Sequence, residues 1–200
     1  MLVSKKDPAQ ESGTFLFAWI VIMLISSLML PIVLVYFIQD AIHFSKLHWL
    51  FKAPPSAYIA FMCGMLMITA GMIVYLIIKV KTDKKPVFLV SLIIILLSSP
   101  LFYTSLNTYY YFDQEGLHYR ELWSLGQSNY KWKDFKQVHA VFDKKPNRGS
   151  TLKEYEFVIS ENKTIVIPVD TAFMENRQRI NASLEENKVP LDNNLADFYE

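Results

Sequence analysis

Long uncharged runs dominate the first half of the chain, and short alternating runs dominate the second half. The uncharged runs lie at residues 15–38, 57–78 and 87–104. As helices, which rise about 1.5 Å per residue, they are long enough to cross a bilayer core of about 30 Å. Pro31 lies inside the first run and predicts a kink or a tilt there. The pattern therefore predicts three transmembrane helices in a membrane domain that covers residues 15–105.

The polar segments around these runs predict how the membrane domain is connected. Residues 1–14 are polar, and we expect a short disordered lead. The first run is longer than the apolar core of a secretory signal and no small-residue cleavage site follows it, so we expect it to be retained. Residues 39–56 mix apolar residues with His and Lys, which favours an interfacial helix with Trp49 as its anchor. Residues 79–86 predict a tight basic turn.

Small residues recur along one side of the second run. Ala60, Gly64 and Gly71 fall on one helical face. Small side chains let helix backbones approach closely in lipid, so this face is a candidate contact within the chain or between two copies. Glycine is also common in membrane helices without such a role, and the sequence leaves both interpretations open.

The second half of the chain predicts an α+β domain at residues 106–187, followed by a polar tail at 188–200. Apolar and polar residues alternate in six short runs separated by turn signals, which predicts six strands. Asp170 or Thr171 can cap a helix over Thr171–Glu186. We expect the six strands to form a small curled sheet or barrel, with the helix closing its open end. The helix residues expected to face inward are Phe173, Ile180 and Leu184.

The charge balance argues against a nucleic-acid-binding function, and the single cysteine is interpreted as a structural residue. The first 105 residues carry 8 Lys and Arg against 4 Asp and Glu, whereas the remainder carries 12 against 15. A domain with an acidic balance lacks the basic excess of a nucleic-acid binder, so we expect no nucleic-acid partner. Cys63 is the single cysteine and lies in an apolar run, where it is expected to act as a small buried hydrophobic residue.

Residues that could carry out a reaction are scattered. The three runs contain no ionisable side chain of the kind that pumps and proton relays use, which disfavours a transporter. His43 and His48 stand five residues apart without a supporting carboxylate or cysteine, so we expect no metal site. His118 and His139 lie on different predicted strands, and no Ser or Cys is evidently placed as a nucleophile. We therefore expect a protein that is not an enzyme and that needs no cofactor.

Two further groups are weak candidates for binding. Trp132 and Asp134 could contact a ligand, but we favour a structural role in which Trp132 packs into the core and Asp134 caps a one-turn helix. A basic loop could instead meet anionic lipid headgroups, each charge contributing about 1 kcal/mol near a negative leaflet, or simply be solvated. The basic residues of this loop are Lys144, Lys145, Arg148 and Lys153.

The run YFDQEGLHYRELWSLGQSNYKWKDFKQVHAVF resembles the bacterial PH-like domain of small membrane proteins. The resemblance rests on a D-x-x-G-apolar hairpin followed by an apolar-x-W-x-D-apolar-x-x-apolar step. These motif positions are Asp113, Gly116, Leu117, Tyr130, Trp132, Asp134, Phe135 and Val138. It covers residues 108–187 and implies a PH-like fold that follows membrane spans, although two spans are the more common layout in that family. Some relatives are accessory or bacteriocin-resistance proteins.

These observations favour a multi-pass membrane protein, in contact with membrane lipid, whose PH-like domain binds a protein or peptide partner at the membrane surface. The alternatives are an immunity or resistance factor against a membrane-active peptide and an accessory subunit of a membrane enzyme or transporter.

The charges in the connections bear on orientation in the cell membrane. Six Lys lie in the lead and the 79–86 turn, whereas Lys46, Lys52 and Arg120 flank the other side. Positive residues in short loops stay cytoplasmic, which predicts a cytoplasmic N-terminus and an extracytoplasmic PH-like domain. The resemblance favours a cytoplasmic PH-like domain instead.

Overall fold

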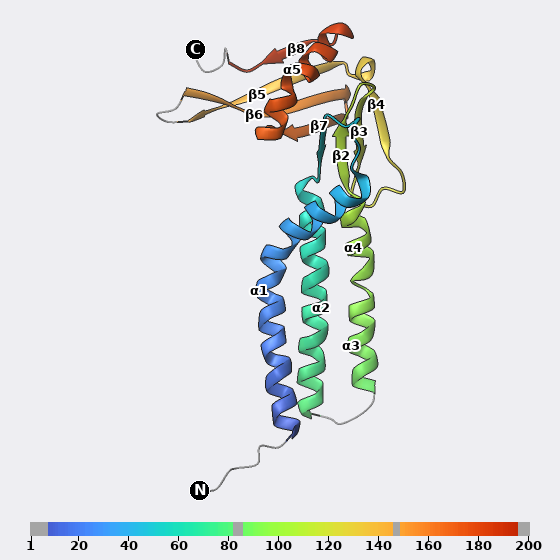
Figure 1. Ribbon diagram of the computed structural model, residues 1–200, viewed down its shortest axis with the longest axis vertical. Helices are drawn as coiled ribbons and strands as arrows, with labels where there is room; N and C mark the ends of the chain where they lie inside the picture. Colours follow the sequence, from blue (N-terminus) through green and yellow to red (C-terminus); the bar gives the residue numbers. More distant parts are fainter. Residues whose placement is uncertain (1–7, 82–85, 146–148, 196–200) are drawn as a thin grey trace. The chain divides into compact units, whose positions relative to one another are not determined.

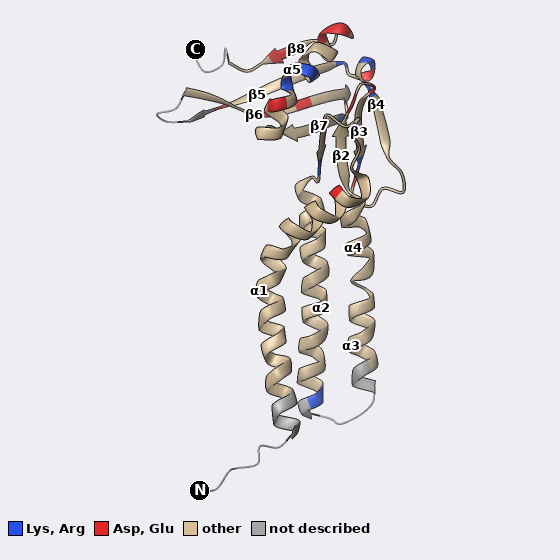
Figure 2. Cartoon of the chain, in the orientation of Figure 1, with Lys and Arg blue, Asp and Glu red and all other residues tan. Residues whose placement is uncertain are grey.

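The first half of the chain forms long helices, as the uncharged runs predict. The computed structural model describes residues 8–81, 86–145 and 149–195. Its first four helices are α1 Pro8–His43, α2 Pro55–Lys81, α3 Pro86–Leu96 and α4 Ser99–Leu106 (Figure 1). Gly13–His43, Pro55–Lys79 and Leu89–Leu106 are long and apolar enough to cross a membrane, so the prediction of three such helices is confirmed. Among the described residues, Figure 2 shows no charge along the middle of any of them.

The chain divides into two compact units, which are described separately. A helical unit contains residues up to His43, then 53–109 and 121–124. A β-rich unit contains residues 44–52, 110–120 and the chain from 125 onward.

Helix α1 is longer than the sequence pattern predicts. It begins at Pro8, a residue well suited to the first turn of a helix because it has no N–H to satisfy there. The expected disordered lead is therefore wrong for residues 8–14, and residues 1–7 lie outside the described residues. Pro31 lies inside α1, where it removes one intrahelical hydrogen bond, and α1 changes direction towards its C-terminal end (Figure 1).

The third span is interrupted between α3 and α4. Pro100 has no N–H to donate to the carbonyl of Leu96, four residues earlier. The hydroxyl of Ser99 donates to that carbonyl instead, at 2.7 Å. The neighbouring hydroxyl of Ser98 donates to the carbonyl of Ile95 at 2.6 Å. Ser99 thus gives the carbonyl of Leu96 a donor in place of the missing N–H of Pro100, whereas the carbonyl of Ile95 accepts from both the hydroxyl and the N–H of Ser98.

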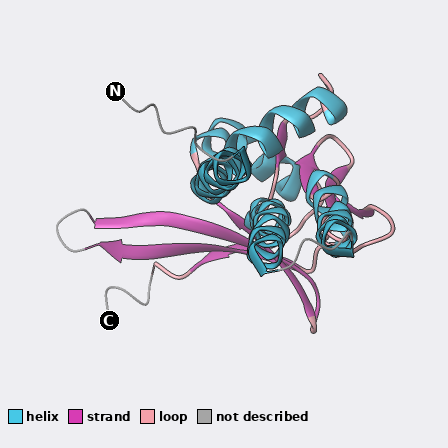
Figure 3. Ribbon diagram, turned by 90° about the horizontal axis from the view of Figure 1, so that it is seen from below, coloured by secondary structure: helices cyan, strands magenta, loops and turns pink. Residues whose placement is uncertain are grey.

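The small residues of α2 form a contact face within the chain. A Cβ atom built on Gly64 would lie 2.9 Å from the ring of Phe102 in α4. One built on Gly71 would lie 3.2 Å from Ile95 and 3.3 Å from the carbonyl of Ser91, both in α3. The glycines therefore let the third span approach α2 closely; Figure 3 shows the spans side by side, almost end-on.

A buried polar layer joins the helices near the end of α1. Gln39 is 1% exposed, and its Nε2 donates to the carbonyl oxygens of Ser105 and Thr108, both at 2.9 Å. The hydroxyl of Ser105 donates to the carbonyl of Ala57 in α2 at 2.7 Å. Gln39 follows directly after the first uncharged run and joins α1 to the end of the third span, while Ser105 joins the third span to α2.

The first connection contributes a strand to the β-rich unit instead of an interfacial helix, so that prediction is wrong. Strand β1 Leu50–Lys52 pairs antiparallel with β2 Tyr109–Phe112, with Leu50 opposite Phe112. The N–H of Trp49 donates to the carbonyl of Phe112 at 2.8 Å, and its ring stacks on Trp132 with centroids 6.1 Å apart. The free edge of β2 offers this segment backbone partners that an interfacial helix would not satisfy.

Two four-stranded sheets form the unit. The first has the order β1-β2-β3-β4, where β3 is Gly116–Arg120 and β4 is Ser128–Lys131. The second has the order β7-β6-β5-β8. Its strands are β5 Gln137–Lys145, β6 Gly149–Ser160, β7 Lys163–Pro168 and β8 Leu191–Asn193. The described residues thus contain eight strands instead of the six that were expected, because the first connection and the tail each add one.

Helix α5 Thr171–Glu186 covers the core of this unit, as predicted. Asp170 caps it by accepting a hydrogen bond from the N–H of Phe173 at 3.0 Å, and also pairs with Lys52 of β1. Partial burial lowers the pKa of Lys52, and Asp170 supplies the opposite charge. The buried core residues include Leu50, Tyr110, Phe112, Leu117, Trp132, Phe135, Val138, Tyr155, Phe157, Ile167, Phe173, Ile180 and Leu184. All three residues expected to face inward from α5 are therefore buried.

Candidate functional site

Trp132 and Asp134, the first pair that the sequence singles out, have structural roles. Trp132 is buried, and its Nε1 donates to the carbonyl of Asp113 at 3.3 Å. Asp134 ends the 3-10 turn Trp132–Asp134 and accepts a hydrogen bond from the N–H of Lys131 at 2.9 Å. The prediction that one residue packs and the other caps is confirmed.

The basic residues considered for headgroup contact lie around the β5–β6 hairpin. Lys144 and Lys145 are opposite Ser150 and Gly149 in the strand pairing, and Arg148 lies outside the described residues. Lys153 is exposed on β6 and pairs with Glu154 at 3.1 Å. Headgroup contact through this set stays a prediction.

His118 lies in a hydrogen-bonded cluster that ties β2, β3 and β4 together. Its Nε2 lies 3.1 Å from Asp113 Oδ1, and its Nδ1 lies 2.8 Å from Asn129 Oδ1. Gln127 Nε2 donates to the Tyr111 hydroxyl at 3.0 Å and to Asn129 Oδ1 at 2.7 Å. The rings of Tyr111 and His118 stack at 4.5 Å. Both nitrogens of His118 are thus engaged in holding neighbouring strands.

His139 is part of a separate, more exposed contact. Its Nδ1 lies 2.5 Å from Asp192 Oδ1, and Gln137 Nε2 donates to the other oxygen of that carboxylate at 2.8 Å. These contacts attach β8 to β5. No group of three or more His, Cys, Asp or Glu in the described part of the chain could hold a metal ion.

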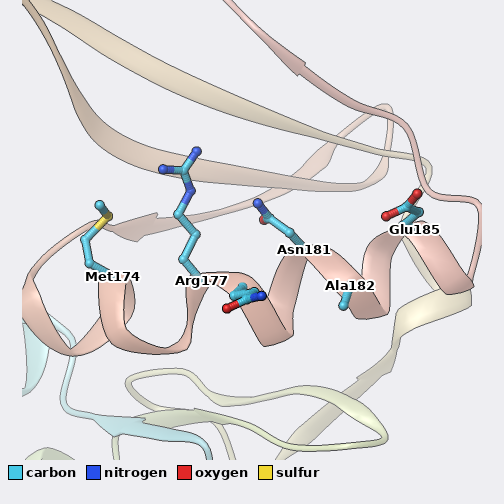
Figure 4. A pocket seen from close by; sticks show the side chains of 6 residues that line it. Met174, Arg177, Asn181, Ala182 and Glu185 are labelled. Atoms are coloured by element: carbon cyan, nitrogen blue, oxygen red, sulfur yellow. The ribbon is translucent and has the colours of Figure 1, made fainter.

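The outer side of α5 lines an open cleft of about 560 Å³ in the β-rich unit (Figure 4). Its volume falls within the range of about 300–1,000 Å³ that is common for ligand pockets. The lining residues are Met174, Arg177, Gln178, Asn181, Ala182 and Glu185. They follow the helical spacing of three and four, so they form one continuous stripe beside the buried face of α5.

A short hydrogen-bonded chain fixes the polar centre of this cleft. Arg177 Nε donates to the hydroxyl of Tyr155 at 3.1 Å, and that hydroxyl donates to Asn181 Oδ1 at 3.3 Å. The ring of Tyr155 is fully buried on β6, so it provides a rigid support. Among the described residues, no carboxylate forms an ion pair with Arg177. The terminal guanidinium nitrogens therefore remain available for a ligand.

The charges of the cleft are arranged along the helix. Arg177 provides a positive charge and Glu185 a negative one eight residues later, a separation of about 12 Å at about 1.5 Å per residue. Figure 4 shows Arg177, Asn181 and Glu185 extending to the same side of α5. Met174 and Ala182 provide apolar surface between and beside them. The arrangement can hold an elongated ligand with a negative group at one end and a positive group at the other.

Sequence reasoning missed this cleft. The spacing of Arg177, Asn181 and Glu185 on α5 is a detectable signal, but charged residues with that spacing usually form a solvated helix face. What distinguishes them is the hydroxyl of Tyr155, which comes from a strand that is distant in the sequence.

Comparison of the chain with protein families, with curated proteins and with solved structures finds no match.

Proposed function

We propose that the chain is a multi-pass membrane protein without enzymatic activity, whose PH-like C-terminal domain binds an extended segment of a protein or peptide partner. The observation that carries the proposal is the cleft on α5, with Arg177 held by Tyr155 at one end and Glu185 at the other. The three apolar helices support the membrane location. The two sheets and the closing helix, together with the motif resemblance, support the PH-like assignment.

The shape of the cleft favours a peptide over a compact small molecule. An extended chain advances about 3.3 Å per residue, so about 12 Å corresponds to roughly four residues. A segment with an acidic residue at one end and a basic residue three or four positions away would meet Arg177 and Glu185 together. The amide of Asn181 lies between them, where it can meet the backbone of such a segment.

The proposal is tested by site-specific photo-crosslinking in the host cell. A photoreactive residue at Gln178 lies on the cleft, whereas one at Arg179 is exposed on another side of α5 and serves as the matched control. We expect crosslinks to a single partner segment from position 178 and none to that segment from position 179. Mass spectrometry of the adduct identifies the segment, which is then synthesised for titration.

Titration of the synthesised segment against the purified full chain completes the test. Arg177→Ala, and Ala182→Trp, which fills the cleft, should each weaken binding by about tenfold or more, whereas Arg179→Ala should leave it unchanged. Equal affinity of all four proteins would rule out the cleft as the binding site.

The absence of catalysis has its own test. Replacement of His118 or His139 by Gln should leave biological activity intact as long as folding and partner binding are intact. Loss of activity in such a variant, with both properties preserved, would contradict a non-enzymatic role.

A further inference from the structure

The loop between β3 and β4 carries two large apolar side chains with little protein around them. Leu125 is 102% exposed and Trp123 is 60% exposed. Large apolar side chains two residues apart in a short loop are costly to keep in water, and they mark surfaces that contact something else.

The backbone of this loop adopts a conformation that a bulky residue rarely takes. Trp123 has a φ of +68°, in the left-handed region that glycine and asparagine tolerate far better than tryptophan. The indole of this residue lies outside the core, since Trp123 is 60% exposed. A strained residue that also exposes its apolar ring points to a role outside the fold of its own unit.

The connectivity of the chain brings this loop back to the end of the last span. Helix α4 ends at Leu106 and β2 begins at Tyr109. Strands β2 and β3 are neighbours joined by a tight turn in which the N–H of Asp113 donates to the carbonyl of Gly116 at 3.1 Å. Such a hairpin returns the chain to the level where it started, so the end of β3 lies beside the start of β2.

The compact units agree with this placement. Residues 121–124 belong to the helical unit, although the strands on both sides of the loop belong to the β-rich unit. Residues 121–124, Trp123 among them, therefore group with the unit that contains α4, whereas Leu125 begins the next segment of the β-rich unit.

We propose that the tip of this loop, residues 123–125, inserts into the interfacial layer of the same bilayer that the three helices cross. Indole rings are favoured at the level of the headgroups, and leucine gains by entering the acyl boundary below them. Arg120 and Glu121 flank the tip with opposite charges, so the contact is driven by apolar burial and needs no anionic lipid. Independence from anionic lipid distinguishes this contact from one made by the basic β5–β6 hairpin, which would require anionic headgroups.

Spin labelling of the full chain in zwitterionic vesicles tests the proposal. In a Cys63→Ser background, single labels are placed at Leu125→Cys, at Asn162→Cys in the exposed turn between β6 and β7, and at Leu28→Cys within the first span. Collision with oxygen reports the membrane, and collision with a water-soluble nickel complex reports solvent. We expect the label at 125 to favour oxygen, as the label at 28 does, whereas the label at 162 favours nickel.

Each other outcome contradicts the proposal. A label at 125 that matches the label at 162 places the loop in water, and one shielded from both reagents places it against protein. A label at position 28 that collides with the nickel complex would show that the first helix does not cross the membrane. That result would contradict the membrane location and would leave the proposed binding role of the α5 cleft untouched. Oxygen preference at 125 that appears only after anionic lipid is added would show an electrostatic contact instead of apolar insertion.

The contribution of Trp123 is tested by the substitution Trp123→Gly, which suits the left-handed backbone and removes the side chain. In this variant the oxygen preference at position 125 should fall by at least about twofold, because the interfacial side chain is lost. An unchanged preference would show that Trp123 does not anchor the loop.

Discussion

Gln39 donates a hydrogen bond to the carbonyl oxygen of Ser105 across 66 positions of sequence, at 2.9 Å and out of contact with solvent. The same amide reaches Thr108, so one side chain holds the end of α1 against the end of the third span. Backbone oxygens at the end of a helix lack intrahelical donors, and the Nε2 group of Gln39 serves two such oxygens, while its Oε1 is buried without a hydrogen-bond partner among the described residues.

Replacement of Gln39 by Leu should therefore destabilise the helical unit by about 1–3 kcal/mol, since interhelical hydrogen bonds in membranes contribute about 0.6–2 kcal/mol each. Unfolding of the full chain in mixed micelles measures the change. Ser27→Ala is the control, because Ser27 is equally buried in α1 but donates within its own helix, to Leu24. Equal effects of the two substitutions would contradict a connecting role for Gln39.

Leu50 should be as important to the β-rich unit as a residue of its central strands. It is 3% exposed and belongs to the main core, although it comes from the first connection. Leu50→Ala should cost about 2–5 kcal/mol, the usual range for a buried leucine, whereas Leu47→Ala should cost almost nothing because Leu47 is exposed. Hydrogen exchange of the β-rich unit in the full chain compares the two. Equal protection in both variants would show that β1 is dispensable.

Ile180→Asp should abolish folding of the β-rich unit, because an unpaired carboxylate would lie in the core beneath α5. Gln178→Asp is the matched control, since it introduces the same charge two residues away on an exposed position. Near-ultraviolet circular dichroism of the two full-length variants should show loss of tertiary signal only for the first. A native spectrum for Ile180→Asp would place this side of α5 outside the core.

Gly64→Val should weaken packing between α2 and α4, because even a Cβ atom at this position would lie 2.9 Å from the ring of Phe102. Gly13→Val makes the same chemical change in α1, where no atom lies within 4 Å. We expect the first variant to be less stable than the second by about 1–3 kcal/mol, the usual cost of overpacking. Comparable unfolding curves in micelles would mean that the ring of Phe102 moves away freely.

The orientation predicted from the loop charges is tested by thiol labelling of Asn193→Cys in a Cys63→Ser background. Position 193 lies in β8 of the β-rich unit and is exposed. With a cytoplasmic N-terminus and three spans, an impermeant reagent should label this cysteine in intact cells. Protection in intact cells, followed by labelling after lysis, would place the domain in the cytoplasm.

Much of the fold follows from the sequence because its determinants are local. Uncharged runs of about 20 residues can bury their backbone in lipid only as helices, so the spans are predictable from composition alone. The buried face of α5 is equally predictable, since helical periodicity places Phe173, Ile180 and Leu184 on one side. The capping role of Asp134 is predictable for the same reason, because it depends on Lys131 nearby in the chain.

The remaining features were decided by tertiary structure. Residues 50–52 have no strand pattern of their own and become a strand because the edge of β2 offers unpaired backbone groups. Arg177 would be an ordinary surface residue without the hydroxyl of Tyr155, which the pairing of β6 places beneath α5. Gln39 reaches its partners only after α1 and α4 have packed together. Sequence periodicity determines which face of an element is apolar, but it does not specify which distant residue will meet that face, because that contact exists only in the folded chain.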